Sequence, residues 1–143
     1  MAVAPIVKYN TFIDELSKAG HNLATAVFKA ALTNTAPGLT TDTVWNTTVA
    51  PAPAAAAGYT AGGNTLTTAS ATTTAGVFKL TLNDTVFTAA GGSIGPFRYV
   101  VIYNSSATNK VVASIDNGAS VTLADTDTFT VDLDQTNGTL TVQ

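Results

Sequence analysis

The chain has 143 residues, a net charge of −3 and only 10% charged residues, although about 25% is usual for a soluble domain. No two of its six lysines and arginines are adjacent, which argues against a nucleic-acid partner because phosphate binding requires a basic patch. The absence of cysteine excludes disulfides and thiolate chemistry, and no apolar run reaches the roughly 18 residues of a membrane helix.

The first 20 residues predict an extended arm followed by one short helix. A proline in the middle of residues 1–10 favours extended backbone, so this segment is expected to form an N-terminal arm. Thr11 is a favourable N-cap, Asp14 suits the positive end of a helix dipole, and Gly20 suits a helix stop. The pattern therefore predicts a helix over residues 11–19.

The next segment predicts a strand and then a long irregular stretch. From Ala24 every second residue is apolar, which favours a strand over residues 24–33, although the alanines make a helix the competing prediction. Residues 36–63 contain three prolines, a run of alanines and four glycines, which indicates a long surface loop or arm that gains order from a neighbour. Trp45 lies within it, either as a core anchor or at an interface.

The remainder predicts strands separated by turns. Residues 97–104 are apolar on both faces, as in the middle of a sheet, and Asn137-Gly138 is typical of a hairpin between the last two strands. This spacing, without alternating helices, predicts a mainly-β chain: one domain over residues 1–143, an antiparallel β-sandwich or small barrel with one short N-terminal helix and extended arms. The predicted core residues are Phe78, Leu80, Tyr99, Val101, Phe129, Val131 and Leu133.

Chemistry-bearing residues are sparse. The one histidine, His21, has no oriented acid or nucleophile in its sequence neighbourhood, so we expect it to be exposed or to cap a turn. Asp132 and Asp134 lie in a stretch that superficially resembles a calcium loop, but the glycine comes one place late and no glutamate follows. They are expected to face outward and protect a sheet edge, with a weak cation site left open. We therefore predict a protein that is not an enzyme, with no catalytic, cofactor-binding or metal-binding residues.

Six segments, taken together, carry a family resemblance. They are residues 8–12 (KYNTF), 20–23 (GHNL), 28–37 (FKAALTNTAP), 58–63 (GYTAGG), 92–99 (GSIGPFRY) and 129–138 (FTVDLDQTNG). Their order resembles a family of small tailed-bacteriophage virion structural proteins. The resemblance implies a capsid decoration (cement) protein that stabilises the head by bridging major capsid subunits. The alternative is a tail or fibre component, including a receptor- or glycan-binding module; an enzyme such as a glycan hydrolase is the least supported class.

Partners follow from the same resemblance. It implies that the chain binds itself, as a homo-oligomer with a trimer favoured, and the major capsid protein, with no cofactor, nucleic acid or membrane. The chain start lacks the basic and uninterrupted apolar segments of a signal peptide, so we expect synthesis in the host cytoplasm and residence in the virion. Apolar and aromatic residues of the two predicted arms are the expected interface residues: Ile6, Val7, Tyr9, Val44, Trp45, Val49 and Tyr59.

Overall fold

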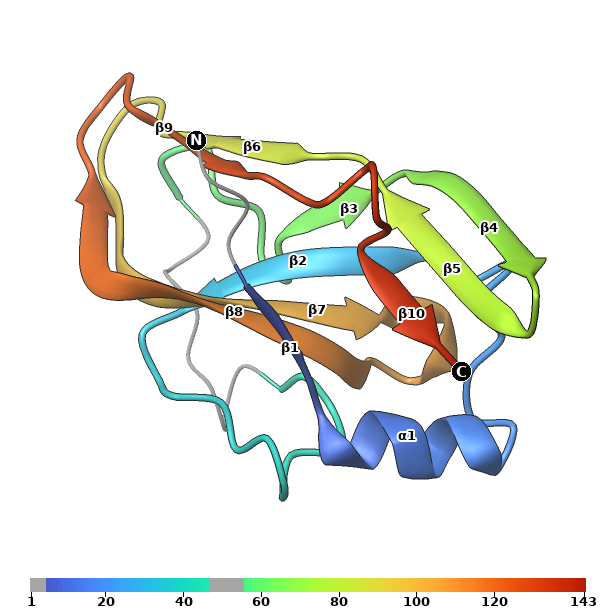
Figure 1. Ribbon diagram of the computed structural model, residues 1–143. Coiled ribbons are helices and arrows are strands. Elements are labelled where there is room, and N and C mark those ends of the chain that lie inside the picture. Colours follow the sequence, from blue (N-terminus) through green and yellow to red (C-terminus); the bar gives the residue numbers. More distant parts are fainter. Residues whose placement is uncertain (1–4, 47–55) are drawn as a thin grey trace.

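The computed structural model describes residues 5–46 and 56–143, and it is built mainly of β-strands (Figure 1). Strands hold 48% of these residues and helices 8%, so the prediction of a mainly-β chain with one short α-helix is confirmed. The strands form three antiparallel sheets in a sandwich-like arrangement.

The largest sheet has the spatial order β1, β8, β7, β2 and β3. In that order the strands are Ile6–Lys8, Lys110–Leu123, Ile94–Asn104, Phe28–Thr33 and Asn64–Leu66. β7 lies in the middle, and every residue from 100 to 104 is buried. A strand that is apolar on both faces needs cover on both, so the prediction of a central strand at residues 97–104 is confirmed.

Two smaller sheets lie across the largest one (Figure 1). One has the order β10, β5 and β4, which are Leu140–Val142, Val77–Leu82 and Thr68–Thr74. The other pairs β6 (Thr85–Thr88) with β9 (Thr128–Val131), and a short 3-10 helix, η1 (Ser105–Ala107), joins β7 to β8. Helix α1 (Asn10–Ser17) lies on the opposite side of the largest sheet, so the chain forms three layers.

The core fills the space between these layers. Four predicted core residues, Leu80, Val101, Val131 and Leu133, are buried as expected. The other three, Phe78, Tyr99 and Phe129, are only half-buried. Other apolar and aromatic side chains, which are not in that predicted set, are fully buried: Tyr9, Phe12, Phe28, Phe97 and Leu32.

Helix α1 begins and ends earlier than predicted. Thr11 does not cap it, because its hydroxyl donates a hydrogen bond of 2.6 Å to the backbone oxygen of Asp42. The helix begins at Asn10, and the buried side chain of Tyr9 anchors the turn before it. At the other end the Gly20 amide donates to the Glu15 oxygen at 2.7 Å, and Ala19, with a φ of 59°, adopts the left-handed conformation that ends the helix.

β2 is shorter than the predicted strand. A turn at residues 23–25 precedes it, in which the Asn22 side chain accepts a hydrogen bond of 3.2 Å from the Ala24 amide. Asparagine offers the backbone this alternative to a sheet ladder, and the small alanines add little burial that would favour a strand. The strand therefore begins at Phe28, the first large apolar residue of the alternation.

The hairpin predicted at Asn137-Gly138 is wrong. β9 pairs with β6 and β10 pairs with β5, so the two strands that flank this turn belong to different sheets. The Asp134 carboxylate organises the turn by accepting hydrogen bonds from the amides of Thr136 and Asn137, at 2.9 and 2.7 Å. These bonds, that of Asn137 first, lower the pKa of Asp134. Asp134 therefore stabilises a turn, and it does not occupy the outward-facing strand position that was predicted for it.

The two predicted arms pack largely on their own chain. β1 lies in the N-terminal arm and pairs antiparallel with β8. Within residues 36–63, Val44 forms a bridge with Lys110, the Trp45 amide donates 2.7 Å to the oxygen of Asn109, and Tyr59 is buried. These backbone and side-chain contacts are intramolecular, so the described parts of both predicted arms pack on their own chain. Residues 1–4 and 47–55 lie outside the described part of the chain.

The first testable prediction concerns the core. Phe97 is fully buried and its ring meets that of Phe129 edge-on, with centroids 5.0 Å apart. Phe97→Ala is expected to lower the free energy of unfolding by about 3–5 kcal/mol, because a large cavity replaces the ring. Urea denaturation measures it. The control, Val86→Ala, removes a side chain that is 49% exposed and should change stability by no more than about 0.5 kcal/mol; equal effects would contradict the layer assignment.

Candidate functional site

Two kinds of site find no support in the described residues. The described residues contain no group of three or more histidine, cysteine, aspartate or glutamate side chains placed to hold a metal ion. The stretch around Asp132 and Asp134 therefore forms no such group. The described part also has no helix that is long and apolar enough to cross a membrane. Hollows on the surface of the described residues are candidates for binding another molecule.

The predicted interface residues do not form one surface. Tyr9, Trp45 and Tyr59 are buried in the core, where their own chain covers their rings, so they are not part of an exposed surface. Val7 and Val44 are exposed by 48% and 41%, and Ile6 is half-buried. Val49 lies outside the described residues.

Trp45 borders a mostly polar hollow of about 580 Å³. Its ring stacks on Tyr103, with centroids 5.9 Å apart and an interplanar angle of 17°. The Tyr103 hydroxyl donates 2.7 Å to the oxygen of Gly62, and burial raises the pKa of Tyr103 to about 12, so this donor stays protonated. Both rings are buried, so they support the wall of the hollow without offering an open face.

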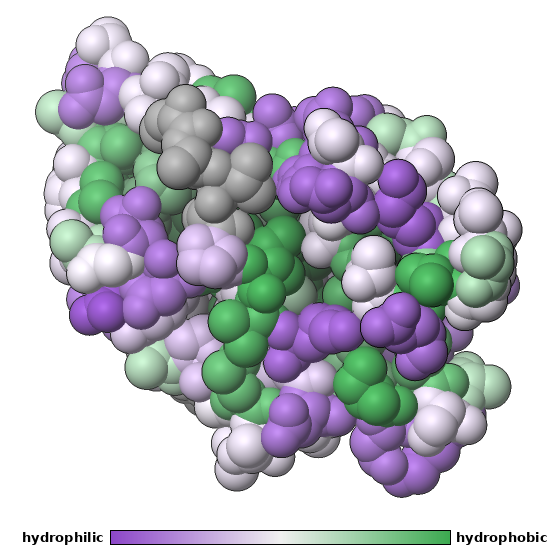
Figure 2. Space-filling model, in the orientation of Figure 1, coloured by the Kyte–Doolittle hydropathy of each residue, from purple (hydrophilic) through white to green (hydrophobic). Residues whose placement is uncertain are grey.

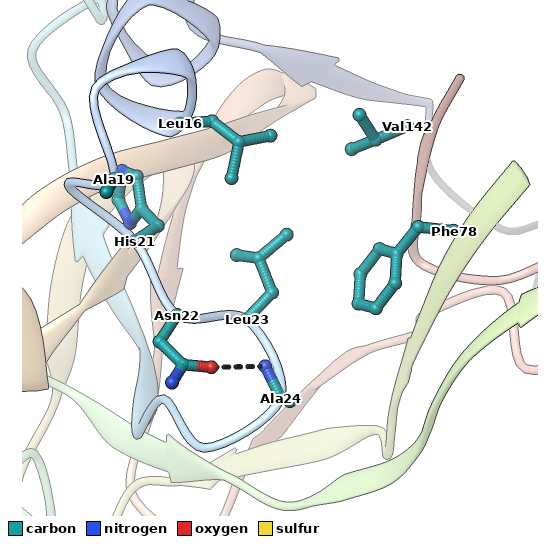
Figure 3. A pocket seen from close by; sticks show the side chains of 8 residues that line it. All are labelled: Leu16, Ala19, His21, Asn22, Leu23, Ala24, Phe78 and Val142. Carbon is teal, nitrogen blue, oxygen red and sulfur yellow. Dashed lines mark hydrogen bonds between the residues drawn. The ribbon is translucent and has the colours of Figure 1, made fainter.

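An apolar groove lies between helix α1 and strand β10. Its larger part has a volume of about 630 Å³, and Figure 3 shows Leu16, Leu23, Phe78 and Val142 arranged around it. The remaining lining residues come from the connection between α1 and β2: Ala19, His21, Asn22 and Ala24. On the face seen in Figure 2, hydrophobic residues gather along the line of β1 and between α1 and β10.

The groove continues along the helix into a second hollow of about 380 Å³. Leu16 and Val142 line both hollows, and Ile13, which is 46% exposed, extends the apolar wall. Lys8 closes one side, because its ammonium donates 3.1 Å to the backbone oxygen of Thr141 and so ties β1 to β10. We call the two hollows together the α1–β10 groove.

Sheet topology explains why this groove exists. Leu16 belongs to the helical layer, whereas Phe78 and Val142 belong to the small sheet on the other side of the molecule. The five-stranded sheet separates these layers elsewhere, but its edge strand β1 has only three residues. Beyond this short edge the two outer layers face each other directly, and their half-buried apolar side chains border solvent. Exposed apolar surface of this kind marks interaction sites.

His21 lines the groove and is buried, so of its two predicted environments, solvent exposure and a turn cap, exposure is wrong. Its exposed fraction is 7%, and its ring lies 5.0 Å from that of Phe12. Asn104 accepts from the Ser106 amide through Oδ1 at 3.0 Å, which turns its Nδ2 towards His21 Nδ1, 3.2 Å away. The ring therefore accepts at Nδ1 and carries its proton at Nε2, which has no partner among the described residues.

The surroundings of His21 favour its neutral form. Burial lowers its pKa first and the charge of Lys110 lowers it further, while the Glu15 carboxylate opposes them. Lys110 and Glu15 form an ion pair between β8 and α1. Because this pair is largely self-neutralising, desolvation decides the balance, and the ring acts as a packed, uncharged support for the groove wall.

Sequence reasoning missed the groove itself. Ile13 and Leu16 lie three residues apart in the predicted helix, but the alternation places Phe78 in the core and the Asn137-Gly138 signal places Val142 in a hairpin. Nothing in the sequence indicates that β10 pairs with β5 and so brings Val142 beside Phe78. The register of two distant strands creates the site.

No family model matches the chain, and searches of curated proteins and of solved structures also find no match. The functional proposal therefore depends on the surfaces of the molecule and on the family resemblance of its motifs.

The second testable prediction concerns pH. The pKa of His21 is lower in the folded than in the unfolded chain, where its usual value is 6.5, so below that pH the unfolded state binds more protons. The free energy of unfolding should therefore decrease as pH falls from 7 to 5, before most carboxylates titrate. His21→Phe keeps an aromatic ring against Phe12 and should flatten this slope. Urea denaturation at each pH measures it, and equal slopes in parent and variant would contradict the buried neutral ring.

Proposed function

We propose that this chain is a non-enzymatic structural protein of a tailed-bacteriophage virion, where it decorates the capsid and stabilises the head by bridging major capsid subunits. The observation that carries the proposal is the α1–β10 groove, an apolar hollow on a β-rich domain with few charges. The order of the turn and strand motifs, which resembles small virion proteins of this kind, points in the same direction.

The character of the groove favours a protein segment as the occupant. Its volume is within the range of small-molecule sites, roughly 300–1,000 Å³, but such sites also place several polar groups around the ligand. Here the walls are aliphatic and aromatic, and polar groups such as Lys8 and Asn22 lie at the sides. A partner that presents a few apolar side chains on an extended segment fits this arrangement, and we assign that segment to the major capsid protein.

The low charge of the chain also suits this role. A decoration protein binds at many equivalent places on a shell, so strong net charge would make neighbouring copies repel each other. The net charge is only −3, and threonine is the commonest residue, with 27 copies. Self-association belongs to the proposal too, and the family resemblance favours a homotrimer.

A tail or fibre component that binds a receptor or glycan is the alternative, and the polar hollow at Trp45 is the feature that favours it. Stacking on a sugar requires an open ring face. Trp45 is 6% exposed and Tyr103 is 3% exposed, so neither ring has such a face free in this conformation. We therefore prefer the capsid proposal.

Labelling of virions distinguishes the two. Gold-conjugated antibody against the chain, applied to purified virions of the phage that encodes it, should label heads densely in electron micrographs. Label confined to tails would support the alternative, and virions that carry none of the chain would contradict both.

The third testable prediction links the groove to capsid binding. Ile13 is exposed, so Ile13→Gln should leave the fold intact while removing an apolar contact at the groove. Binding to heads that lack the chain should weaken by roughly tenfold, the equivalent of about 1.4 kcal/mol of lost apolar burial. Val86→Gln is the matched control, because Val86 is similarly exposed on β6, outside the groove. Co-sedimentation with heads measures the affinity of both variants. An unchanged affinity of Ile13→Gln would show that the groove does not contact the capsid.

A further inference from the structure

The edges of the three sheets differ in how well they are protected. Among the described residues the edge strands are β1 and β3, β10 and β4, and β6 and β9. Five of them have three or four residues, whereas β4 has seven. Figure 1 shows β4 at the outer margin of the molecule. Short edge strands offer few free backbone groups for pairing, so β4 offers the most of these six strands.

β4 also lacks the features that usually prevent edge pairing. It carries no charged residue and no proline, and residues 72–74 are exposed. Within the described part of the chain, no side chain of β4 makes a hydrogen bond or ion pair. The opposite edge of the same sheet differs, because the ammonium of Lys8 covers the backbone of β10 at Thr141. Natural edges are commonly protected by such lysines, by prolines or by short length.

The sequence of β4 is complementary to itself. β4 pairs with β5 in regular register over residues 70–74, after a bulge between Thr68 and Ser70. The midpoint of this regular part is Thr72. In an antiparallel pair of two β4 strands centred there, Thr72 faces Thr72, Ser70 faces Thr74, and Ala71 faces Thr73. Hydroxyl side chains directly opposite each other stabilise antiparallel pairs, and no like charges meet.

The nearest charge on β5 points away from this edge. Lys79 lies opposite Thr72 in the β4–β5 pair. Its ammonium donates 3.2 Å to the backbone oxygen of Thr136, in the loop that leads to β10 on the other side of β5. Two copies joined through β4 would therefore not bring their Lys79 ammonium groups together.

We propose that β4 pairs antiparallel with β4 of a second copy across a twofold axis, so that two three-stranded sheets become one continuous sheet. Such a contact is isologous: each copy uses the same strand, and the axis passes beside Thr72. The inference deepens the proposed function by naming the surface for self-association, and it replaces the trimer of the resemblance with a dimer. It is separate from the α1–β10 groove, which stays available to the capsid.

Thr72→Glu is the fourth testable prediction and the test of this contact. The parent chain should sediment with twice its 14.5 kDa mass at micromolar concentration. Thr72→Glu places a carboxylate opposite Lys79 of its own chain, which keeps the fold, but it places two carboxylates together at the axis. The dissociation constant should rise at least tenfold. Thr88→Glu, at an exposed position on edge strand β6, is the matched control and should dimerise as the parent does.

Charge reversal makes the test specific. Thr72→Lys should also dissociate, and an equimolar mixture of Thr72→Glu and Thr72→Lys should form heterodimers, because opposite charges then meet at the axis. Circular dichroism checks that each variant is folded, and Thr72→Asp or Thr72→Arg, which keeps the same charge at the axis, replaces any that is not. A parent that is monomeric, a trimer, or a dimer insensitive to Thr72→Glu would overturn the β4 contact. None of these outcomes affects virion labelling, which tests the proposed function by itself.

Discussion

The structure depends on strand β7, whose residues 100–104 are buried on both faces and bonded to a long strand at each edge. Alternation sends Val101 and Tyr103 towards one side, where Trp45 and the turn at Tyr9 cover them. Val100 and Ile102 face the other side, where the two small sheets cover them. Because one strand requires apolar cover on two faces, the fold must have three layers, and the positions of α1 and of residues 36–46 follow from that requirement.

The same layering produces the groove. The two outer layers cover opposite faces of one central sheet, and they come into contact wherever that sheet is too short to separate them. β1 is such a place, since it ends after three residues and passes directly into α1. Lys8, at its end, closes part of the gap with a single hydrogen bond to β10, and the rest stays open and apolar. A surface that is unfavourable in water is thus a direct consequence of how the core is covered.

Sparse charge shapes the remaining surface. Three of the six basic residues form a local ion pair: Lys18 bonds Asp14 at 2.7 Å, Arg98 bonds Asp116 at 2.8 Å, and Lys110 pairs with Glu15. Exposed pairs of this kind contribute little stability, typically about 0–1 kcal/mol. Their effect is to leave hydroxyl and methyl groups as the dominant surface chemistry. Such a surface would not repel a partner strand at β4 electrostatically, and it would not repel an apolar segment in the groove.

The proposals therefore rest on two different physical features of one chain. The groove offers apolar area that gains from leaving water, which suits a partner with apolar side chains. The β4 edge offers free backbone donors and acceptors, which suit another strand regardless of its hydrophobicity. The two features lie on different strands of the same small sheet, β10 and β4, at its opposite edges. A copy paired through β4 would keep its groove accessible.

The sequence by itself determined the elements whose signal is local. The apolar residues on both faces of 97–104 identified β7, strand spacing identified a mainly-β chain, and the start and stop signals at the ends of residues 11–19 identified the helix, because each of these signals comes from neighbouring residues. Hydrogen bonds from side chains to the backbone limit the accuracy of such predictions. The Asn22 side chain bonds the turn before β2, which begins later than predicted, and Asp134 bonds a turn where the sequence predicts a hairpin.

Only the tertiary structure decided which strands pair and which side chains meet. His21 and Asn104 are 83 residues apart in sequence, and their contact depends on how α1 sits on the sheet. Val142 lies beside Phe78 because β10 pairs with β5, and Trp45 is a core residue because its ring stacks on Tyr103. Strand pairing is governed by burial summed over the whole molecule, so no short stretch of sequence contains that information. The candidate groove consists of such long-range contacts, which is why it appeared only in the folded chain.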